Sequence, residues 1–391
     1  LACKRFYGCA ADRLQIFAVT GTNGKTTTTN MLKCIFEADG IKTGLIGTNS
    51  VEYCGIVRPA TLTTPDPTLL HRLFAEMYSA GVTHVIMEAS AHALALKKLD
   101  GIRFSAVGFT NLTRDHLDFF GDMETYKRAK LSLFSSRFSF SLCVNADDAC
   151  GREIIESADA EVYSYGAENE CRFRAENIVM TNKGSVFTLG GRKAQLNTPG
   201  KFNVYNALCA VSMASAAGTP MKNILEGLKN FKGVEGRFEA VSFNGGSVII
   251  DFAHTDDGLK NILTAVREFT PGRLITVFGC GGDRDRSKRP LMGRAAAMLS
   301  DIVVVTSDNP RGEKPEDIIS DIENGIKTVG IVDYFLEPDR KKAIRRALEL
   351  MEKGDTTVIA GKGAERYQEI RGVKYPYNDR EYVLELIGEK P

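Results

Sequence analysis

Short apolar runs alternate with longer amphipathic segments over the first 150 residues of the chain. This alternation is typical of strands in a parallel sheet that are joined by crossover helices. Nearly every run ends in a polar cluster, and open α/β sheets bind ligands beyond the carboxyl ends of their strands. We therefore expect these clusters to share one crevice. The runs that we expect to be strands are residues 14–19, 43–47, 83–87, 106–109 and 141–145.

The pattern changes between residues 161 and 198, where short alternating runs and Gly190-Gly191 predict a small antiparallel β excursion. A helix is expected over residues 203–217. A second α/β series then begins, and polar or glycine-rich clusters again follow its strands. The strand-like runs of this series are residues 248–250, 274–278, 302–306 and 357–359.

The overall composition narrows the class of protein. A net charge of +1 gives no field to attract nucleic acid or an anionic membrane, so any anion site must be local. No apolar run approaches the roughly 18 residues of a membrane span. The nine cysteines are scattered without a CxxC pair, which favours the reduced cytoplasm. We expect a cytoplasmic monomer that acts on small molecules.

A glycine-rich stretch lies between the first strand and the helix-patterned segment 26–39. Glycines let backbone N–H groups converge on phosphate oxygens, and the lysine and the helix N-terminus add positive charge. The general pattern G-x-x-x-x-G-K-[ST] has Val19 in place of its first glycine. The stretch is therefore either a nucleoside triphosphate site or a glycine-rich turn with an exposed lysine. The residues of the expected phosphate site are Gly21, Thr22, Asn23, Gly24, Lys25, Thr26 and Thr27.

The predicted fold class is therefore α/β. We expect a P-loop ATPase domain, whose mostly parallel sheet carries the small β excursion, over residues 1–233. A Rossmann-like α/β domain is expected over residues 234–391, with the boundary near Lys232 and Gly233.

Two further polar clusters follow predicted strands of the first domain. Glu88 comes directly after an apolar run, where a carboxylate can hold Mg²⁺ or position a water. The less favoured alternative is a helix-capping or solvated glutamate. His116 lies in the polar segment 110–118, and we favour a metal or phosphate role over a structural one. Lys130, taken alone, reads as a solvated lysine.

Two segments of the second domain mix charges of both signs. Residues 283–289 predict either a salt-bridged surface loop or an anion clamp. The segment D-N-P-R at residues 308–311 combines carboxylate and guanidinium groups. Such a set suits a zwitterion, because the carboxylate can bind an ammonium and the arginine can bind a carboxylate.

These motifs together resemble the Mur ligases of peptidoglycan synthesis, and most closely the UDP-N-acetylmuramoyl-tripeptide synthetases that add the third amino acid. The resemblance runs in order from about residue 14 to the C-terminus and covers the central ATPase domain and the C-terminal amino-acid-binding domain. The matching segments are TGTNGKTTT (20–28), TLTTPDP (61–67), MEASAHAL (87–94), FTNLTRDHLDFFGDMETYKRAKLSLF (109–134), GKFNVYNALCA (200–210), EGRFEAV (235–241), DFAHTDDGL (251–259), FGCGGDRDRSKRPLMG (278–293), SDNPRGEKPEDI (307–318) and AGKGAERYQ (360–368).

The resemblance implies roles for particular residues. The cofactors that it implies are ATP and two Mg²⁺ ions, with Lys130 as the carbamate formed with CO₂. The implied catalytic residues are Lys25, Glu88, His116 and Lys130. Thr26 and Glu88 resemble ligands of the first magnesium, and His116 and Lys130 ligands of the second. The residues that resemble further ATP contacts are Asn206, Arg237, Asp251 and His254. The residues that resemble contacts to the muramoyl substrate are Thr63, Thr64 and Ser90. The residues that resemble the amino-acid pocket are Arg284, Asp308, Asn309, Arg311, Gly361 and Glu365.

The implied reaction is amide ligation through an acyl phosphate, with domain closure to exclude water. The D-N-P-R form goes with meso-diaminopimelate rather than lysine, because Arg311 would hold the distal carboxylate that lysine lacks. The chain begins at Leu1, and the family's usual N-terminal domain, which holds the uridine nucleotide, is expected to be missing or removed.

Four residues depart from the family pattern: Leu96 and Lys98 replace glutamine and arginine, Asp256 replaces proline, and Ala364 replaces histidine. A second hypothesis is therefore a related ligase with another carboxylate acceptor. A folylpolyglutamate synthetase is a third hypothesis, which the D-N-P-R segment disfavours. A non-catalytic ATP-binding regulatory protein is a fourth, and the intact Lys25, Glu88, His116 and Lys130 argue against it.

Overall fold

The structure is a computed structural model that describes residues 1–181, 184–330 and 332–388. The chain divides into two compact units. The first unit consists of Leu1–Thr113 and Phe120–Lys232, and the second of Arg114–Phe119 and Gly233–Pro391. The short segment Arg114–Phe119 thus makes its contacts with the second unit, although its neighbours in sequence belong to the first.

One sheet runs through the first unit. Over the described residues it has eleven strands, in the order β11-β10-β9-β8-β7-β6-β1-β5-β2-β3-β4. The strands β7, β6, β1, β5 and β2 pair in parallel, which confirms the predicted parallel sheet. The strands are β1 (Gln15–Thr20), β2 (Thr43–Ile46), β3 (Ser50–Tyr53), β4 (Ile56–Pro59), β5 (His84–Glu88), β6 (Ala106–Phe109), β7 (Ser141–Asn145), β8 (Glu161–Gly166), β9 (Phe173–Thr181), β10 (Gly184–Leu189) and β11 (Arg192–Leu196).

The β excursion over residues 161–198 differs from the expectation. It begins with β8, which pairs parallel with β7, and β9 pairs parallel with β8. Within the excursion, the antiparallel pairs are β9 with β10 and β10 with β11. The excursion therefore extends the parallel sheet before it turns into a meander, and the prediction of antiparallel pairing throughout was wrong. Alternation along a strand reports which face is buried and not the direction of the neighbouring strand.

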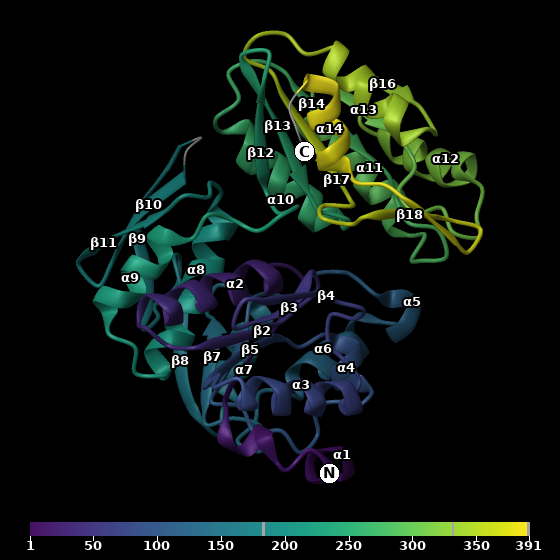
Figure 1. Ribbon diagram of the computed structural model, residues 1–391. Coiled ribbons are helices and arrows are strands. Elements are labelled where there is room, and N and C mark those ends of the chain that lie inside the picture. Colours follow the sequence, from purple (N-terminus) through teal and green to yellow (C-terminus); the bar gives the residue numbers. More distant parts are fainter. Residues whose placement is uncertain (182–183, 331, 389–391) are drawn as a thin grey trace. The chain divides into compact units, whose positions relative to one another are not determined.

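Helices cover both faces of the first sheet (Figure 1). Successive side chains of a strand point to opposite faces. Ile16 of β1 accordingly packs in a cluster with Phe74 of α3, whereas the ring of Phe17 lies 4.8 Å from that of Phe36 on α2. The helices of this unit are α1 (Ala2–Phe6), the 3₁₀ helix η1 (Ala10–Arg13), α2 (Lys25–Ala38), α3 (Pro67–Ser79), α4 (Ala91–Ala95), α6 (Met123–Leu131), α7 (Ala149–Glu156), α8 (Lys201–Ala216) and α9 (Met221–Asn230), and α5 (Leu117–Phe120) overlaps the segment grouped with the second unit.

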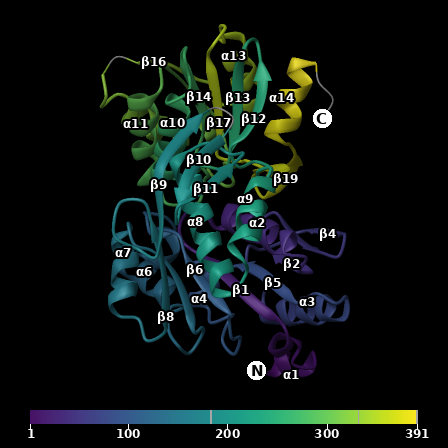
Figure 2. The ribbon, with the colours of Figure 1, turned by 90° about the vertical axis from the view of Figure 1, so that its left-hand side faces the viewer.

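The second unit has its own sheet, in the order β12-β13-β17-β14-β15-β16. All neighbours pair in parallel except β12 and β13. Helices α10 and α11 lie on one side of these strands and α14 on the other (Figure 2). The strands are β12 (Glu239–Phe243), β13 (Gly246–Asp251), β14 (Leu274–Phe278), β15 (Ile302–Val305), β16 (Asp333–Leu336) and β17 (Thr356–Ala360), with a separate hairpin of β18 (Tyr367–Ile370) and β19 (Val373–Pro376). The helices are α10 (Asp256–Arg267), α11 (Lys288–Leu299), α12 (Pro315–Ile326), α13 (Arg340–Glu349) and α14 (Asp379–Ile387).

Within the described ranges, no helix combines the length and the apolar character that crossing a membrane requires.

Candidate functional site

The glycine-rich loop follows β1 and leads directly into α2. Its two glycines are required by close contacts within the first unit. Gly21 has φ +151°, and a Cβ there would lie 1.9 Å from Oγ1 of Thr110. Gly24 has φ +85°, and a Cβ there would lie 2.1 Å from Oδ1 of Asn206. The loop therefore has no room for a side chain at either position, and its backbone can approach a phosphate group closely.

The segment after β6 holds the loop in place. The backbone N–H of Thr22 donates to the carbonyl of Asn111 at 2.9 Å, and that of Asn23 donates to the Asn111 side chain at 2.9 Å. Oγ1 of Thr110 donates to the carbonyl of Asn23 at 2.6 Å. The loop is thus fixed by the polar end of the neighbouring strand.

Lys25 begins α2 and bends back over the loop. Its Nζ donates to the carbonyls of Gly21 at 2.8 Å and Thr22 at 2.9 Å. The side chain is half-buried rather than extended into solvent, so Lys25 is not the exposed lysine of the alternative interpretation. The ammonium group therefore lies against the backbone of the loop.

Thr26 and Glu88 place side-chain oxygen atoms beside the loop. Thr26 lies in the first turn of α2 and is 5% exposed, and Glu88 is the last residue of β5, which pairs with β1. The Glu88 carboxylate is fully buried and accepts bonds from the backbone N–H and the hydroxyl of Thr48 at 2.8 and 2.9 Å. The interpretation of Glu88 as a solvated or helix-capping glutamate is therefore wrong. A hydroxyl and a carboxylate are suitable ligands for Mg²⁺, which prefers oxygen atoms. The remaining ligands of a protein-bound Mg²⁺ are usually phosphate oxygens or water molecules.

No group of three or more His, Cys, Asp or Glu side chains could hold a metal ion in the part of the chain that the structure describes. A magnesium ion at this loop would therefore depend on the Thr26 hydroxyl and on phosphate oxygens in addition to Glu88.

Lys130 also reaches the loop. It lies on α6, is only 1% exposed, and donates from Nζ to the carbonyl of Gly21 at 2.8 Å. The same Nζ lies 4.6 Å from the centre of the Tyr126 ring. The interpretation of Lys130 as a solvated lysine is wrong. The structure brings Lys25 and Lys130 to the same backbone carbonyl.

His116 belongs to the segment that is grouped with the second unit. It has φ +56°, and its Nε2 lies 3.3 Å from a carboxylate oxygen of Asp115. Nε2 of His254 lies 3.6 Å from the same oxygen. Burial by itself would raise the pKa of Asp115, but the contact with His254 and the charges of His254, His116 and Lys288 hold that pKa well below its usual range. The carboxylate is therefore ionised and orients both imidazoles.

The residues expected to contact the muramoyl substrate lie around the end of β5. Oγ1 of Thr64 donates to the carbonyl of Glu88 at 2.8 Å and accepts from the N–H of Ser90 at 3.0 Å. The hydroxyl of Thr48, which donates to the Glu88 carboxylate, lies within hydrogen-bond distance of the hydroxyl of Thr63, at 3.2 Å. The structure thus joins this group to the predicted magnesium ligand Glu88.

Asn206 lies on α8 and is buried next to the loop. Its Oδ1 lies 3.5 Å from the hydroxyl of Thr28 in the first turns of α2, and its Nδ2 donates to Asn203 at 3.3 Å. The structure therefore brings Asn206 next to the glycine-rich loop, although Asn206 lies 178 residues beyond Thr28 in sequence.

In the second unit, Asp251 ends β13 and closes a small hydrogen-bonded turn. Its carboxylate accepts from the backbone N–H groups of Phe238 and Ala253, each at 2.7 Å. Burial raises the pKa of Asp251, although the charge of Arg237 opposes the shift. The Arg237 guanidinium stacks 4.2 Å from the centre of the Phe252 ring. The structure brings Arg237, Asp251 and the following residues together.

The ends of β15 and β17 carry most of the expected amino-acid pocket. Nδ2 of Asn309 donates to the Glu365 carboxylate at 3.0 Å. Gly361 has φ +117°, and a Cβ there would lie 2.6 Å from Oδ2 of Asp308. Asp308 and Asn309 are both buried. The structure therefore joins residues that follow β15 with residues that follow β17, two strands that lie on either side of β14.

Lys362 is a residue of this pocket that the sequence patterns did not single out. It is fully buried, and its Nζ donates to Oδ1 of Asn309 at 3.0 Å and to the Glu365 carboxylate at 2.7 Å. A second carboxylate oxygen, on Asp308, lies 4.0 Å away. The signal that the sequence holds is a lysine between two glycines directly after a strand, which by itself indicates no particular role.

The two arginines of the pocket lie near Gly281. A Cβ at Gly281 would lie 2.8 Å from Nη1 of Arg311 and 3.7 Å from Cγ of Arg284. Arg311 has φ +50° and donates from Nη1 to the carbonyl of Gly282 at 2.8 Å. Arg284 is about half exposed and lies 3.5 Å from Asp118. The guanidinium of Arg311 and the aliphatic part of Arg284 thus both lie beside Gly281.

The charged segment 283–289 is not a simple surface loop. Arg289 is 1% exposed and forms an internal ion pair with Glu313 at 2.7 Å. Lys288 is also buried and donates to the carbonyl of His254 at 2.9 Å. Only part of this segment can therefore act as an anion clamp, and Arg284 is the residue of the expected pocket whose side chain extends into solvent.

The four departures from the family pattern have different surroundings. Lys98 forms an ion pair with Asp66 at 2.7 Å, and Leu96 is 57% exposed. Asp256 begins α10, and its Oδ1 is buried without a hydrogen-bond partner. Ala364 is half-buried, and its backbone N would lie 2.0 Å from a Cβ at Gly236.

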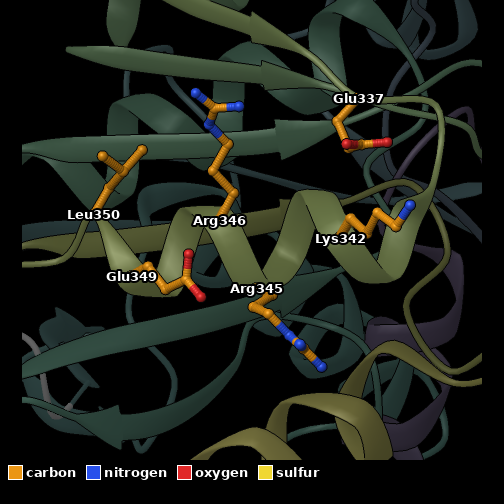
Figure 3. A pocket seen from close by; sticks show the side chains of 6 residues that line it. All are labelled: Glu337, Lys342, Arg345, Arg346, Glu349 and Leu350. Carbon is orange, nitrogen blue, oxygen red and sulfur yellow. The ribbon is translucent and has the colours of Figure 1, made fainter.

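A pocket elsewhere in the second unit lies along α13 and is lined by charged side chains. Arg345 and Arg346 extend from the helix in different directions, and Lys342 lies toward Glu337 (Figure 3). None of the predicted site residues lines this pocket.

Two family models and many named relatives match most of this chain. The Mur ligase middle domain matches residues 19–214, and the Mur ligase glutamate ligase domain matches residues 236–363. A relative from Clostridium botulinum, named UDP-N-acetylmuramoyl-L-alanyl-D-glutamate–2,6-diaminopimelate ligase, is 43% identical over 99% of this chain and 80% of its own length. A relative of the same name from Aquifex aeolicus is 41% identical, also over 99% of this chain and 80% of its own length.

Solved structures show the same fold. A structure with the same ligase name has a TM-score of 0.67 at 33% identity and covers 96% of this chain and 78% of its own. Folylpolyglutamate synthase from Mycobacterium tuberculosis, complexed with ADP, has a TM-score of 0.76 at 19% identity and covers 92% of this chain and 90% of its own. The fold and the phosphate loop define an ATP-dependent ligase that forms amide bonds. The chain belongs to the Mur ligase family.

Proposed function

We propose that this chain joins meso-diaminopimelate to the glutamate carboxylate of UDP-N-acetylmuramoyl-L-alanyl-D-glutamate, with ATP as the energy source. Relatives that are 41–43% identical over nearly the whole chain carry this activity in their names. The observation that carries the proposal is the arrangement of the phosphate loop. Lys25 and Lys130 both donate to the carbonyl of Gly21 at 2.8 Å, and Glu88 ends the adjacent strand.

In this proposal, the loop N–H groups and Lys25 bind the ATP phosphates. Thr26 and Glu88 hold one Mg²⁺, and His116 and Lys130 hold the second. Bound Mg²⁺ would neutralise charge on the phosphoryl group in transfer. Asn206, Arg237, Asp251 and His254 are proposed as further ATP contacts.

Lys130 is proposed to react with CO₂. Its neutral amine would form a new N–C bond, and the released proton would pass to solvent, which leaves an anionic carbamate. The buried position of Lys130 supports this change, because an ammonium beside Mg²⁺ would be repelled whereas a carbamate oxygen is a suitable ligand.

The ligation has two steps. A carboxylate oxygen of the acceptor attacks the γ-phosphorus of ATP, and the bond to ADP breaks. The amine of the amino acid then attacks the acyl carbon, phosphate leaves, and the amine loses a proton. Thr63, Thr64 and Ser90 are proposed to position the acceptor beside Glu88.

The amino acid is proposed to bind at the strand ends of the second unit. Asp308 and Glu365 provide carboxylates for an ammonium group, and Asn309 and Gly361 line the same strand ends. Arg284 and Arg311 provide guanidinium groups that suit a second carboxylate. This set favours diaminopimelate over lysine, because lysine has no distal carboxylate.

A different carboxylate acceptor is the second candidate, because Leu96 and Lys98 depart from the family pattern near the proposed acceptor site. We further propose that the enzyme acts as a monomer in the cytoplasm, where its substrate ATP is found.

The test is phosphate release from ATP with the UDP-muramoyl dipeptide and diaminopimelate, lysine or glutamate, each component also being omitted in turn. We expect release only when both the acceptor and diaminopimelate are present. Turnover with diaminopimelate but not with the muramoyl acceptor would favour the second candidate, and turnover with lysine in place of diaminopimelate would contradict the assignment of Arg311.

A further inference from the structure

Two loops of the second unit meet at the strand ends where the amino acid is proposed to bind. Residues 279–287 follow β14 and carry Arg284, and residues 306–314 follow β15 and carry Arg311. The N–H of Gly282 donates to the carbonyl of Asn309 at 2.9 Å, and a Cβ at Gly282 would lie 2.0 Å from the carbonyl oxygen of Pro310. The two loops are therefore in direct backbone contact.

Glu313 joins these loops through its carboxylate. It receives both Nη atoms of Arg289, at 2.7 and 3.0 Å, in a bidentate pair. The same carboxylate accepts from the backbone N–H of Asp283 at 2.6 Å and lies 3.0 Å from Arg286. Arg289 is 1% exposed and Glu313 11%, so this contact is largely shielded from water. The bond with Arg289 lowers the pKa of Glu313 to about 2, so the carboxylate stays charged at neutral pH.

A second contact runs in the opposite direction. The N–H of Gly312 donates to the carboxylate of Asp283 at 2.9 Å, so that residues 283 and 312–313 hold each other reciprocally. Asp283 and Arg311 both have a left-handed backbone, with φ +53° and +50°. This conformation is unfavourable for residues other than glycine and needs support from the surroundings. The supported residues are Arg311 itself and the residue directly before Arg284.

We propose that Glu313, held by Arg289, is a positioning residue that sets the spacing of Arg284 and Arg311 for the distal carboxylate of the amino acid. The inference rests on the proposed function, because it takes a diamino diacid as the substrate. Glu313 itself contacts no substrate in this account. Its contribution is to fix the two loops whose arginines make the contact, and so to set the preference for diaminopimelate over lysine.

The test compares Glu313→Gln with the wild-type chain in steady-state kinetics for both amino acids. Glutamine keeps the shape of the side chain and loses the charge that receives Arg289. We expect the KM for meso-diaminopimelate to rise about tenfold, with kcat within about twofold and the KM for ATP unchanged. The ratio of kcat/KM for diaminopimelate to that for lysine should fall at least about fivefold.

Two further variants separate positioning from general instability. Asp283→Asn weakens the reciprocal contact at an exposed residue and should change the same ratio in the same direction. Glu323→Gln on α12 removes an ion pair with Lys327 at 2.9 Å without touching either loop, and should leave the ratio unchanged. Isothermal calorimetry of meso-diaminopimelate binding provides a readout that needs no turnover, and Glu313→Gln should weaken this binding to a similar extent.

An unchanged KM and binding constant in Glu313→Gln would overturn the inference, as would an equal loss for both amino acids. If the wild-type chain turns over diaminopimelate and Glu313→Gln gives either of these results, the inference is contradicted but the proposed function is not. A wild-type chain that uses lysine but not diaminopimelate, or binds no diaminopimelate, contradicts the proposed function and the inference together.

Discussion

The buried ion pair between Arg340 and Asp379 should carry a large share of the stability of the second unit. Arg340 begins α13 and Asp379 begins α14, and their side chains are 1% and 0% exposed. Two parallel bonds of 2.7 and 2.8 Å join them. Arg340 also donates to the carbonyls of Ser307 at 3.2 Å and Ala360 at 3.0 Å. These carbonyls directly precede Asp308 and Gly361 in the proposed amino-acid site.

The substitution Asp379→Asn removes the negative charge and leaves the guanidinium in place. Burial works against the charge of Arg340, but the charge of Asp379 outweighs this effect and holds the pKa of Arg340 above its usual range. A guanidinium keeps its proton in proteins even without this support, so Arg340 stays charged in the variant, and the loss of its partner should cost about 3–5 kcal/mol. We expect the lower end, about 3 kcal/mol, because the amide oxygen can still accept one bond. This is a large part of the roughly 5–15 kcal/mol that stabilises a typical domain.

The matched control is Glu381→Gln, which removes an exposed ion pair from the same helix. Arg366 and Glu381 lie 3.1 Å apart with side chains 66% and 51% exposed, and such pairs contribute less than about 1 kcal/mol. Unfolding in urea is monitored by hydrogen exchange. Exchange of β15 and β17 reports on the stability of the second unit, and exchange of β1 and β5 reports on the stability of the first. The Asp379→Asn variant should lose protection in β15 and β17 only. A loss no larger than that of the control would refute this reasoning.

Three further predictions concern the first unit. Gly24→Ala should weaken ATP binding at least about tenfold, because the new methyl group would clash with Asn206. Calorimetry measures the affinity, and an unchanged affinity for ATP would contradict the loop geometry. Lys130→Arg should lower kcat by about 100-fold and abolish the carbamate signal in carbon-13 NMR with labelled CO₂, and full activity would exclude the carbamate. Burial by itself would raise the pKa of Asp147, but hydrogen bonds from backbone N–H groups and Tyr205 outweigh it and lower that pKa to about 2. The stabilisation by Asp147 is therefore complete above about pH 4 and is lost as the pH falls toward 2. The urea midpoints of the wild type and of Asp147→Asn should accordingly converge over that pH range. A difference between the two midpoints that does not change with pH would contradict this prediction.

The parallel sheets could be predicted from the sequence because their strands are buried on both faces. Such strands read as continuous apolar runs, and all of the runs that we predicted are strands. The strands that we missed lie at sheet edges or in hairpins. All four residues of β4 are exposed, and β12 and β16 are only half-buried, so burial did not impose a pattern on them.

The candidate site could be predicted only where a motif specifies the backbone. The glycines of the phosphate loop are required by local close contacts, so their sequence spacing carries the signal. The burial of Lys130 depends on the packing of α6 against a loop 109 residues away, and no local pattern encodes it. Lys362 and Glu313 were missed for the same reason, since Lys362 binds Asn309 after β15 and Glu313 binds Arg289 of α11.

The most direct test of the account follows the oxygen atoms of the acceptor. The UDP-muramoyl dipeptide is labelled with oxygen-18 in its glutamate carboxylate and incubated with the chain, ATP and diaminopimelate. The account predicts that each phosphate released carries one oxygen-18 atom, because the carboxylate oxygen that attacks ATP leaves with the phosphate. Release of unlabelled phosphate would show that water and not the carboxylate is phosphorylated, and would contradict the central claim.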